Sequence, residues 1–339
     1  MKEHLVPTEQ VRQRERDRGD ASVATPAISI IIVNWNTGSL LAECLESIRA
    51  YGSGMVGATI VVDNASSDDS IPIARRAHPA DVQFIQSAAN LGFAKACNLG
   101  ADAASTDYLL FLNPDAKIMS ETLPALVEFL SHPEQSDVGI AGVKLVDSDG
   151  TVSRCCARFP RPREFVARAF GLDRVFKGSV LFMLDWDHAS TRTVDNVIGA
   201  FYLVRRRVFE GLAGFDARFF VYFEDLDFSL RASRCGWRTV YFAGARAFHM
   251  GGGSSSRVIG KRLFYLLRSR LLYSQKHFGY MDHLLVLAAT LLVEPGSRLL
   301  WAISKGSFRT ASHTIGAYAF LAHWYFSPLR VSRTRIDHD

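Results

Sequence analysis

The sequence predicts an α/β fold with a mostly parallel central sheet, helices on both faces of that sheet, and a C-terminal helical extension. Three observations predict it. Short, continuous apolar runs, typical of strands buried on both faces, recur through the first half. Segments with apolar residues at helical spacing lie between these runs, and helical spacing continues without strands after residue 257. With 339 residues and 48% hydrophobic content, the chain can form one large core or two smaller ones.

The first half is predicted to contain four parallel strands joined by helices. Strands are expected at residues 28–33, 59–62, 82–85 and 108–112. One helix is expected around residues 40–48, where Leu41, Cys44 and Ile48 form an apolar stripe, and another around 94–104. Because strands and helices alternate at this spacing, the connections should be right-handed crossovers.

The second half is less regular. After Leu145 the pattern loosens through a Cys/Arg/Pro segment at 154–163, and strand character returns at 198–204. A helix is predicted at 224–234. The Gly/Ser run at 251–256 has no preferred conformation, so it is interpreted as a hinge, a lid or a plain flexible connector.

The first 27 residues interleave Arg with Glu and Asp and contain no apolar stretch of signal-peptide length. They are expected to form a disordered arm (1–27) on a protein that is not secreted. The five cysteines contain no Cys-x-x-Cys pair, and Cys155 and Cys156 are adjacent. We expect all five to be reduced and structural.

The C-terminal extension, residues 257–339, is basic and apolar. It contains twelve Lys and Arg against four Asp and Glu, whereas the whole chain carries only +5. Helical breaks are expected near Gly279 and Pro295, and the apolar run at 284–293 is shorter than the roughly 20 residues of a membrane-spanning helix. The extension is therefore expected to lie on an anionic membrane surface without crossing it. A nucleic-acid partner is not expected, because no binding motif is present, and a solvated basic helical bundle is the remaining alternative.

Polar residues follow the first two predicted strands. Val33, Asn34 and Asn36 end the first strand, and Asp63 and Asn64 end the second. The carboxyl ends of parallel strands share one edge of a sheet, where ligands bind in open α/β folds. Asp63 could accept a hydrogen bond from the imide N–H of a pyrimidine base beside the Asn34 region. The alternative is an Asx turn or helix cap formed with the serines that follow.

Two further segments carry possible ligand-binding residues. The loop with Asn90, Gly92 and Phe93 opens a helix that contains Asn98, and helix-opening amides can face an anion. This loop lacks both the Walker spacing and the G-x-G-x-x-G pattern, so alone it indicates little. The segment from Asn113 to Asp115 directly follows an apolar strand, which places the Asp115 carboxylate where a diphosphate-bound cation would sit. Ordinary turn chemistry is the alternative for this segment.

Other Asp-x-Asp triples occur at 147–149, 185–187 and 225–227, and the first of them is interpreted as a hairpin turn. A strand from Gly199 to Arg206 precedes the acidic segment 224–227. Its small residues leave room for a sugar ring, although a close-packed strand explains them equally well.

Taken in this order, the motifs resemble those of the inverting family 2 glycosyltransferases, which have a Rossmann-like fold of the GT-A type. The motifs are Val-Asn-Trp-Asn, Val-Asp-Asn-Ala-Ser, Asn-Leu-Gly-Phe-Ala, Asn-Pro-Asp and Glu-Asp-Leu-Asp, all within residues 28–256. The chain looks most similar to rhamnosyltransferases of bacterial cell-surface polysaccharide assembly. The resemblance implies a nucleotide-sugar half at 28–115, an acceptor half at 116–256 and the helical extension beyond.

The resemblance also implies cofactors and binding residues. A divalent metal, Mg²⁺ or Mn²⁺, would be held by Asp115 and His249. The nucleotide sugar would be bound by Val33, Asn34, Asn36, Asp63, Asn64, Asn90, Gly92, Phe93, Asn98, Asn113 and Asp115. Asn113 stands where related enzymes carry a first aspartate, which removes one negative charge and leaves the strength of metal binding open.

Asp225 is the general base that the resemblance implies, with Glu224 beside it in the acceptor site. Asp227 is expected to pair with Arg231, four residues later on the same helix. A purely capping role for these acids at a helix N-terminus is the alternative.

The implied reaction transfers rhamnose or a similar deoxyhexose from a dTDP- or UDP-sugar to a hydroxyl of a lipid-linked saccharide, in the cytoplasm at the inner face of the cell membrane. Single additions are favoured, because the Gln-x-x-Arg-Trp signature of processive relatives is not found. Two alternatives stay open at this point: a sugar nucleotidyltransferase, and a non-catalytic nucleotide-binding scaffold on a membrane.

Overall fold

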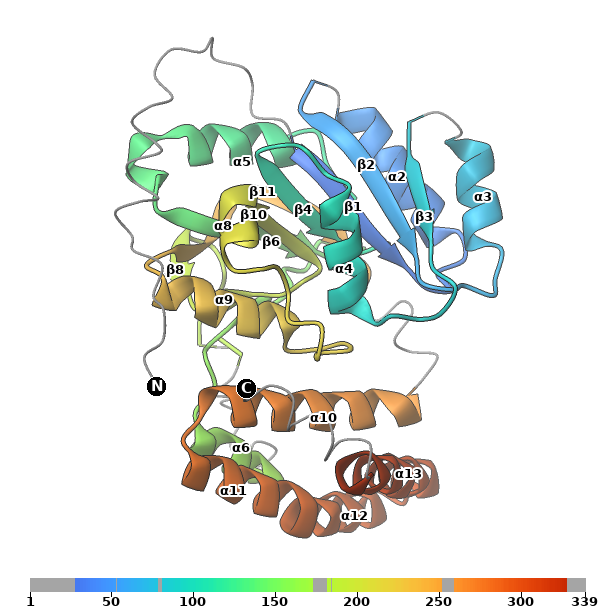
Figure 1. The fold of residues 1–339 in the computed structure, drawn as a ribbon, viewed down its shortest axis with the longest axis vertical. Coiled ribbons are helices and arrows are strands. Elements are labelled where there is room, and N and C mark those ends of the chain that lie inside the picture. Colours follow the sequence, from blue (N-terminus) through green and yellow to red (C-terminus); the bar gives the residue numbers. More distant parts are fainter. Residues whose placement is uncertain are drawn as a thin grey trace, which may run out of the picture.

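A computed structural model describes residues 28–52, 54–78, 81–172, 182–183, 185–251 and 259–327. The chain forms an α/β body and, below it in Figure 1, a layer of helices. Most of this layer comes from the C-terminal end of the chain. The expected N-terminal arm and the part of the Gly/Ser run beyond Gly251 lie outside the described residues.

The body is built on one nine-stranded sheet with the order β3-β2-β1-β4-β10-β6-β11-β5, in which β8 pairs with β11. The strands are β1 (Ile28–Asn34), β2 (Val56–Asp63), β3 (Gln83–Gln86), β4 (Tyr108–Leu112), β5 (Ala116–Ile118), β6 (Val138–Val146), β8 (Arg192–Val194), β10 (Phe201–Arg205) and β11 (Arg238–His249). Strands β10, β5 and β8 run against the others, so the sheet is mostly parallel, as predicted. A small second sheet pairs β7 (Cys156–Ala157) with β9 (Asn196–Val197).

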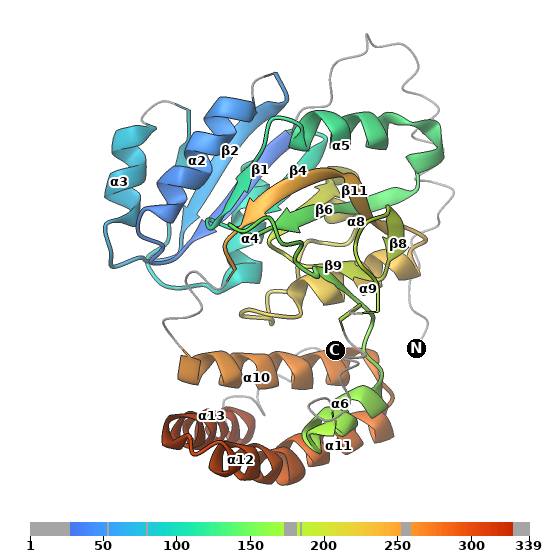
Figure 2. The ribbon, with the colours of Figure 1, turned by 180° about the vertical axis from the view of Figure 1, so that it is seen from behind.

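Helices cover both faces of the sheet. The helices of the body are α2 (Leu40–Tyr51), α3 (Ser70–Ala77), α4 (Phe93–Asp102), α5 (Thr122–Ser131), α8 (Arg206–Gly211) and α9 (Glu224–Arg234), with a short 3₁₀ turn η1 at Pro133–Gln135. Helices α4, α8 and α9 lie in front of the sheet in Figure 1, and α2 lies in front in the reverse view of Figure 2. The predicted helix at 224–234 coincides with α9.

Strand register fixes the edge where the candidate site lies. In the β1–β2 pair Asn34 is opposite Asp63, and in the β2–β3 pair Asp63 is opposite Gln86. All seven residues of β1 and all five of β4 are buried, because these strands are covered on both faces. The carboxyl ends of the parallel strands therefore share one edge, as the sequence predicts.

The turn predicted after Val146 and the strand predicted at 198–204 differ in how well they agree with the structure. The predicted hairpin turn after Val146 is confirmed, since the Gly150 N–H donates to the Asp147 carbonyl at 3.1 Å. The predicted strand at 198–204 is wrong at its start, because β9 ends at Val197 and β10 begins at Phe201. The reason is that the Gly199 N–H donates to a side chain, the Asp225 carboxylate, instead of to a neighbouring strand.

The helical layer contains α6 (Pro162–Ala169), α10 (Ile259–His277), α11 (Tyr280–Ala288), the π-helical segment η3 (Ala289–Val293), α12 (Glu294–Ser304) and α13 (Phe308–Phe326). The predicted break near Gly279 is confirmed, since Gly279 caps α11 with extended backbone angles. Helix α10 lies between the body and the remaining helices (Figure 1).

The predicted break at Pro295 is wrong. Segments α11, η3 and α12 form one continuous helix of 25 residues, Tyr280–Ser304, in place of the ten-residue apolar run expected. Proline lies in the first turn of α12, and the Glu294 N–H donates to the Ala289 carbonyl five residues back. This wider turn accommodates a residue that has no N–H to donate. The helix is long and apolar enough to cross a membrane, which by itself is weak support for a span.

Candidate active site

Asp63 and Asn34 lie side by side at the ends of β2 and β1. Asp63 is 2% exposed and accepts hydrogen bonds from Asn34 Nδ2 at 3.2 Å and from the Ser66 N–H at 3.4 Å. Asn34 Nδ2 also contacts the Ser66 and Ser70 hydroxyls, and its Oδ1 accepts from Thr37 at 2.5 Å. The Asn34 side chain is thus occupied within the protein and orients Asp63. Val33, 8% exposed, precedes this pair.

Asn36 organises the loop that faces this pair. Its backbone is left-handed, with φ of 52°. Its Oδ1 accepts from the backbone N–H groups of Ser67 and Asp68, and its own N–H donates to Ser66 Oγ. These hydrogen bonds join residues about thirty positions apart and hold the loops after β1 and β2 together. The local turn or cap that was the alternative for Asp63 is represented by the hydrogen bond from the Ser66 N–H.

Asn64 holds the loop that opens α4. Its Nδ2 donates to Asn90 Oδ1 at 3.0 Å and to the Gly92 carbonyl at 3.2 Å, and its Oδ1 accepts from the Leu91 N–H at 2.7 Å. The Phe93 N–H donates to the Phe220 carbonyl at 2.5 Å, so this helix-opening amide faces the second half of the chain and not an open anion site.

Asn98 also joins the two halves. Its Nδ2 donates to the Phe215 carbonyl at 2.7 Å, and its Oδ1 accepts from the Phe215 N–H at 2.9 Å. The side-chain amide therefore fixes the turn at Gly214, where φ of 71° favours glycine and a Cβ would lie 2.8 Å from Asn98 Oδ1.

Asp115 and His249 are brought together by strand pairing. In the β5–β11 pair His249 is opposite Ala116, the residue after Asp115. His249 Nε2 lies 3.4 Å from Asp115 Oδ1, and the Met250 N–H donates to the Asp115 carbonyl at 3.1 Å. Both side chains are mostly buried, at 12% and 8% exposure.

This pair fits a divalent cation. Two ligands at about 2.1 Å from an octahedral ion lie roughly 3 Å apart when they are adjacent, close to the observed separation. Carboxylate oxygen suits Mg²⁺ and Mn²⁺, and imidazole favours a transition metal. The donor set therefore fits Mn²⁺ better than Mg²⁺.

Asp225 lies in the first turn of α9 with both carboxylate oxygens held by backbone. Oδ1 accepts from the Leu226 N–H at 2.7 Å, and Oδ2 accepts from the Gly199 N–H at 3.0 Å. Burial raises the pKa of Asp225, although these hydrogen bonds partly oppose the increase. Tyr222 and Phe223, just before the helix, have φ of 69° and 71°, a strained conformation for bulky residues that sets the direction of α9.

The two neighbouring acids have opposite environments. Glu224 is 5% exposed, and its Oε2 has no hydrogen-bond partner among the residues that the structure describes. Burial and the charge of Asp225 raise the pKa of Glu224 well above its usual value. For Asp227 burial acts in the same direction, but the hydrogen bond from His277 and the charges of Arg231 and Lys276 lower the pKa overall. The predicted Asp227–Arg231 pair is confirmed at 2.9 Å.

Gly199 and Ala200 connect the two candidate centres. The Gly199 N–H donates to Asp225, and the Ala200 carbonyl accepts from the Asn113 N–H at 3.0 Å. Asp115 follows Asn113 by two residues. A Cβ at Gly199 would lie 3.8 Å from both Asp225 Oδ2 and the Phe93 ring. Asp225 and the segment that carries Asp115 are therefore hydrogen-bonded to consecutive residues of one short connection.

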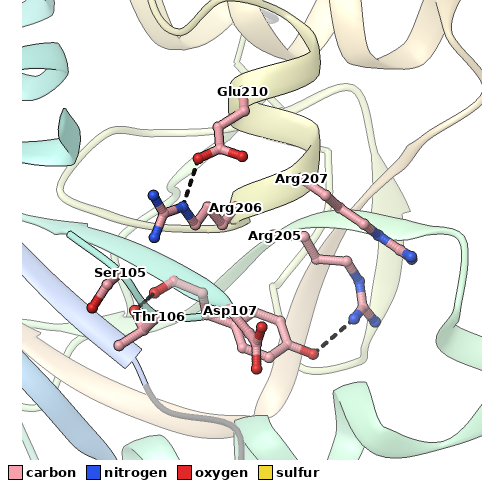
Figure 3. Close-up of a pocket in the computed structure, with 8 residues that line it drawn as sticks. Ser105, Thr106, Asp107, Arg205, Arg206, Arg207 and Glu210 are labelled. Atoms are coloured by element: carbon pink, nitrogen blue, oxygen red, sulfur yellow. Dashed lines mark hydrogen bonds and ion pairs between the residues drawn. The ribbon is translucent and has the colours of Figure 1, made fainter. Parts of the chain in front are cut away.

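A separate cleft of about 560 Å³ lies where β4 begins, at Tyr108. Figure 3 shows the side chains that line it. It is lined by Ser105, Thr106, Asp107, Tyr108, Arg205, Arg206, Arg207 and Glu210. Arg206 pairs with Glu210 at 2.6 Å, and Arg205 donates to the Tyr108 hydroxyl at 2.8 Å. None of the predicted site residues lines it, and β4 begins there, whereas Asp115 follows its end. We assign no part of the candidate site to this cleft.

Comparison with known protein families identifies the family to which the chain belongs. The profile described as glycosyl transferase family 2 matches residues 29–211, more than half of the chain. The chain belongs to this family. A related profile, glycosyl transferase family group 2, matches residues 147–331 and so includes most of the helical layer. The protein is a nucleotide-sugar glycosyltransferase with a GT-A type fold.

Individual relatives are distant. An N-acetylglucosaminyl-diphospho-decaprenol L-rhamnosyltransferase of Mycobacterium tuberculosis is 26% identical over 276 residues, covering 76% of this chain and 87% of the relative. A low-salt glycan biosynthesis hexosyltransferase of Haloferax volcanii is 26% identical over 211 residues, covering 61% and 62%. Among solved structures, a Pyrobaculum calidifontis mannosyltransferase in complex with GDP-Man and Mn²⁺ matches with a TM-score of 0.50 at 19% identity, covering 96% of this chain and 90% of that one.

Several residues of this glycosyltransferase that position helix α9 and its acidic side chains were not identified from the sequence. Lys276 and His277, at the end of α10, contact Asp227 at 2.6 and 2.7 Å. Phe220 stacks on Tyr265 with ring centroids 4.7 Å apart. These partners are far apart along the chain, and no spacing in the sequence connects them.

Proposed function

We propose that the enzyme transfers rhamnose or a similar deoxyhexose, with inversion, from a dTDP- or UDP-sugar to a hydroxyl of a lipid-linked saccharide. The observation that carries this proposal is the position of Asp225, whose carboxylate is hydrogen-bonded to Gly199 next to the segment that carries Asp115. The sugar and the acceptor class are supported by the name of the mycobacterial relative, which acts on a decaprenol-linked sugar.

Asp225 acts as the general base in this proposal. Inversion requires a group that takes the proton of the acceptor hydroxyl while its oxygen attacks the anomeric carbon. Each Asp225 oxygen accepts one backbone N–H, and the Asn196 side chain also hydrogen-bonds this carboxylate. A carboxylate has about four lone-pair sites, so one is left for that proton. Since burial raises its pKa, Asp225 is a stronger base than an exposed aspartate. Glu224 lies beside it and would meet the acceptor.

The nucleotide-sugar half, residues 28–115, binds the donor. Asp63, oriented by Asn34, accepts the imide N–H of the pyrimidine base. Asp115 and His249 would hold the Mn²⁺ or Mg²⁺ ion. When bound there, such an ion neutralises the charge that develops on the departing nucleoside diphosphate. Residues 116–256 form the acceptor half.

The helical layer is proposed to rest on the cytoplasmic face of the membrane. Among the described residues, twelve of the seventeen exposed large hydrophobic side chains lie between Tyr280 and Phe326. The basic charge of residues 257–339 complements an anionic lipid surface. A nucleic acid would not explain the aliphatic residues among them, such as Leu292 and Ile303, at 79% and 71% exposure.

A transfer assay tests the catalytic part. The purified enzyme is incubated with dTDP-rhamnose and other dTDP- and UDP-sugars, Mn²⁺, and a polyprenyl-diphosphate-linked N-acetylglucosamine. We expect transfer from one donor with the opposite anomeric configuration in the product, assigned by NMR. Transfer with retained configuration, or pyrophosphate release from a nucleoside triphosphate instead of transfer, contradicts the proposal; the second result would support a sugar nucleotidyltransferase.

Vesicle flotation tests the membrane part. The full-length enzyme should float with vesicles that contain anionic lipid, and the double variant Leu300→Ser, Ile303→Ser should float less. Tyr51→Ser, which removes an exposed aromatic from the body, is the matched control. Equal flotation of all three proteins would show that the exposed apolar residues do not bind lipid.

A further inference from the structure

Two thiols and one imidazole form a buried cluster away from the candidate active site. The sulfur atoms of Cys155 and Cys156 and a ring nitrogen of His188 all lie within 4.8 Å of one another. The three residues are 2%, 0% and 0% exposed. Cys155 and Cys156 precede and begin β7, and His188 lies in the segment before β8.

The His188 ring is prepared as a ligand. Its Nδ1 lies 3.1 Å from the Trp186 carbonyl, which can only accept, so Nδ1 carries the proton and a neutral ring has its lone pair on Nε2. Nε2 has no hydrogen-bond partner within the described part of the chain. The ring is held in place by stacking on Trp186, with centroids 4.3 Å apart, and by the edge contact with Tyr241.

The backbone at His188 is also strained. Its φ of 59° is in the left-handed region, which non-glycine residues rarely adopt. The Tyr241 hydroxyl donates to the His188 carbonyl at 2.9 Å and keeps that conformation. The protein thus holds, beside two thiols, an imidazole with a buried nitrogen that is unpartnered among the described residues, which is costly unless a ligand is bound.

We infer that Cys155, Cys156 and His188 bind one zinc ion as a structural site. In tetrahedral zinc sites the ligand atoms lie about 3.5–3.8 Å apart, so the observed limit of 4.8 Å requires only small movements. Two thiolates balance the charge of Zn²⁺, whereas Cu⁺ would leave a net negative charge in a buried site. Binding forms two Zn–S bonds and one Zn–N bond and releases the two thiol protons to solvent.

The ion would stabilise the segment from Val197 to Gly199, which hydrogen-bonds the proposed base Asp225. The Ile198 N–H donates to the Cys155 carbonyl at 2.9 Å, and Cys156 is opposite Val197 in the β7–β9 pair. The next residue, Gly199, donates to Asp225. A metal that fixes the two cysteines therefore fixes the strand that leads into the candidate active site.

Metal analysis of the full-length protein tests this inference. Protein expressed with zinc and dialysed against zinc-free buffer should retain one zinc per chain by plasma mass spectrometry. Co²⁺ exchanged into it should show thiolate-to-cobalt charge transfer, and zinc should raise the melting temperature of the apoprotein. Cys156→Ser and His188→Gln should each weaken zinc binding about tenfold or more.

Two controls keep the outcome specific. Cys235→Ser removes the exposed thiol outside the cluster and should keep the zinc. His249→Ala should also keep it, which separates this site from the Asp115–His249 pair. The inference is overturned if the parent protein retains no zinc and shows no cobalt–thiolate absorption. It is also overturned if Cys156→Ser binds zinc as tightly as the parent, or if protein purified without added oxidant contains a Cys155–Cys156 disulfide in place of zinc.

Discussion

Replacing Asp225 with asparagine should abolish most transfer while leaving the enzyme folded. The change removes the proposed proton acceptor, and general-base catalysis contributes about 10²–10⁴-fold, or roughly 3–5 kcal/mol of activation free energy. The asparagine side chain would keep one oxygen for a backbone N–H, but its amide nitrogen would oppose the other donor, Gly199 or Leu226. That mismatch costs about 1–3 kcal/mol of stability.

The stability loss should be partly offset, because the substitution also removes a buried charge whose pKa burial raises. The melting temperature of Asp225→Asn should therefore change by only a few degrees. The assay compares kcat for acceptor glycosylation with the dissociation constant of the nucleoside diphosphate, measured by calorimetry. We expect kcat to fall at least about a hundredfold and nucleotide binding to be retained.

Glu224→Gln is the matched comparison, because it is isosteric and changes the adjacent carboxylate. It should mainly raise the KM for the acceptor. If Glu224→Gln loses the larger share of kcat and Asp225→Asn turns over within tenfold of the parent, the base is Glu224 and the reasoning is refuted.

Three further outcomes are expected. Since burial raises the pKa of Asp225 and the base must be deprotonated, kcat/KM should fall as pH is lowered through a midpoint above about 3.9, the usual value for aspartate; a pH–rate profile with a midpoint at or below that value would contradict this. Asp115→Ala and His249→Ala should each raise the Mn²⁺ concentration for half-maximal activity about tenfold or more, and EDTA should inactivate the parent; unchanged metal titrations would remove both ligands from the proposal. Gly92→Ala places a Cβ 2.4 Å from the Phe220 carbonyl oxygen at φ of 81°. It should destabilise the enzyme by about 2 kcal/mol more than the control Gly150→Ala, at φ of 76°, where no atom lies within 4 Å of the added Cβ. Chemical denaturation measures the two free energies of unfolding, and equal losses would show that the Phe220 contact relaxes freely.

The elements that the sequence predicts best are those decided by local burial. Strand β4 is fully buried, and its continuous apolar run is visible in the sequence. Helix α9 is predicted at its observed bounds because acids open it and apolar residues follow at helical spacing. The same local reasoning places Asp63 and Asp115 after their strands, at one edge of the sheet.

The failures come from interactions between distant residues. The strand predicted from residue 198 begins only at Phe201, because Gly199 donates to a carboxylate 26 residues away. The break predicted at Pro295 does not occur, because the π-helical turn before it lets the helix continue past a residue that has no N–H. The role of Asn34 and Asn98 in binding the nucleotide sugar stays a prediction. The hydrogen bonds that their amides make within the protein could not be read from the sequence.

Helix α9 explains why the helical layer and the proposed chemistry depend on each other. Asp225 and Asp227 are two residues apart, so they point to nearly opposite sides of the helix, about 200° apart. Asp225 is hydrogen-bonded to Gly199, while Asp227, on the other side of the helix, contacts Lys276 and His277 of α10.

Two more contacts from α10 support the strained turn before α9. Ser269 donates to the Val221 carbonyl at 2.8 Å, and Tyr265 stacks on Phe220. The orientation of the proposed base is therefore set by the same helix that packs against α13 in the apolar layer. If that layer rests on lipid as proposed, the proposed lipid-linked acceptor and the proposed base, Asp225, would be positioned by one continuous set of packed helices.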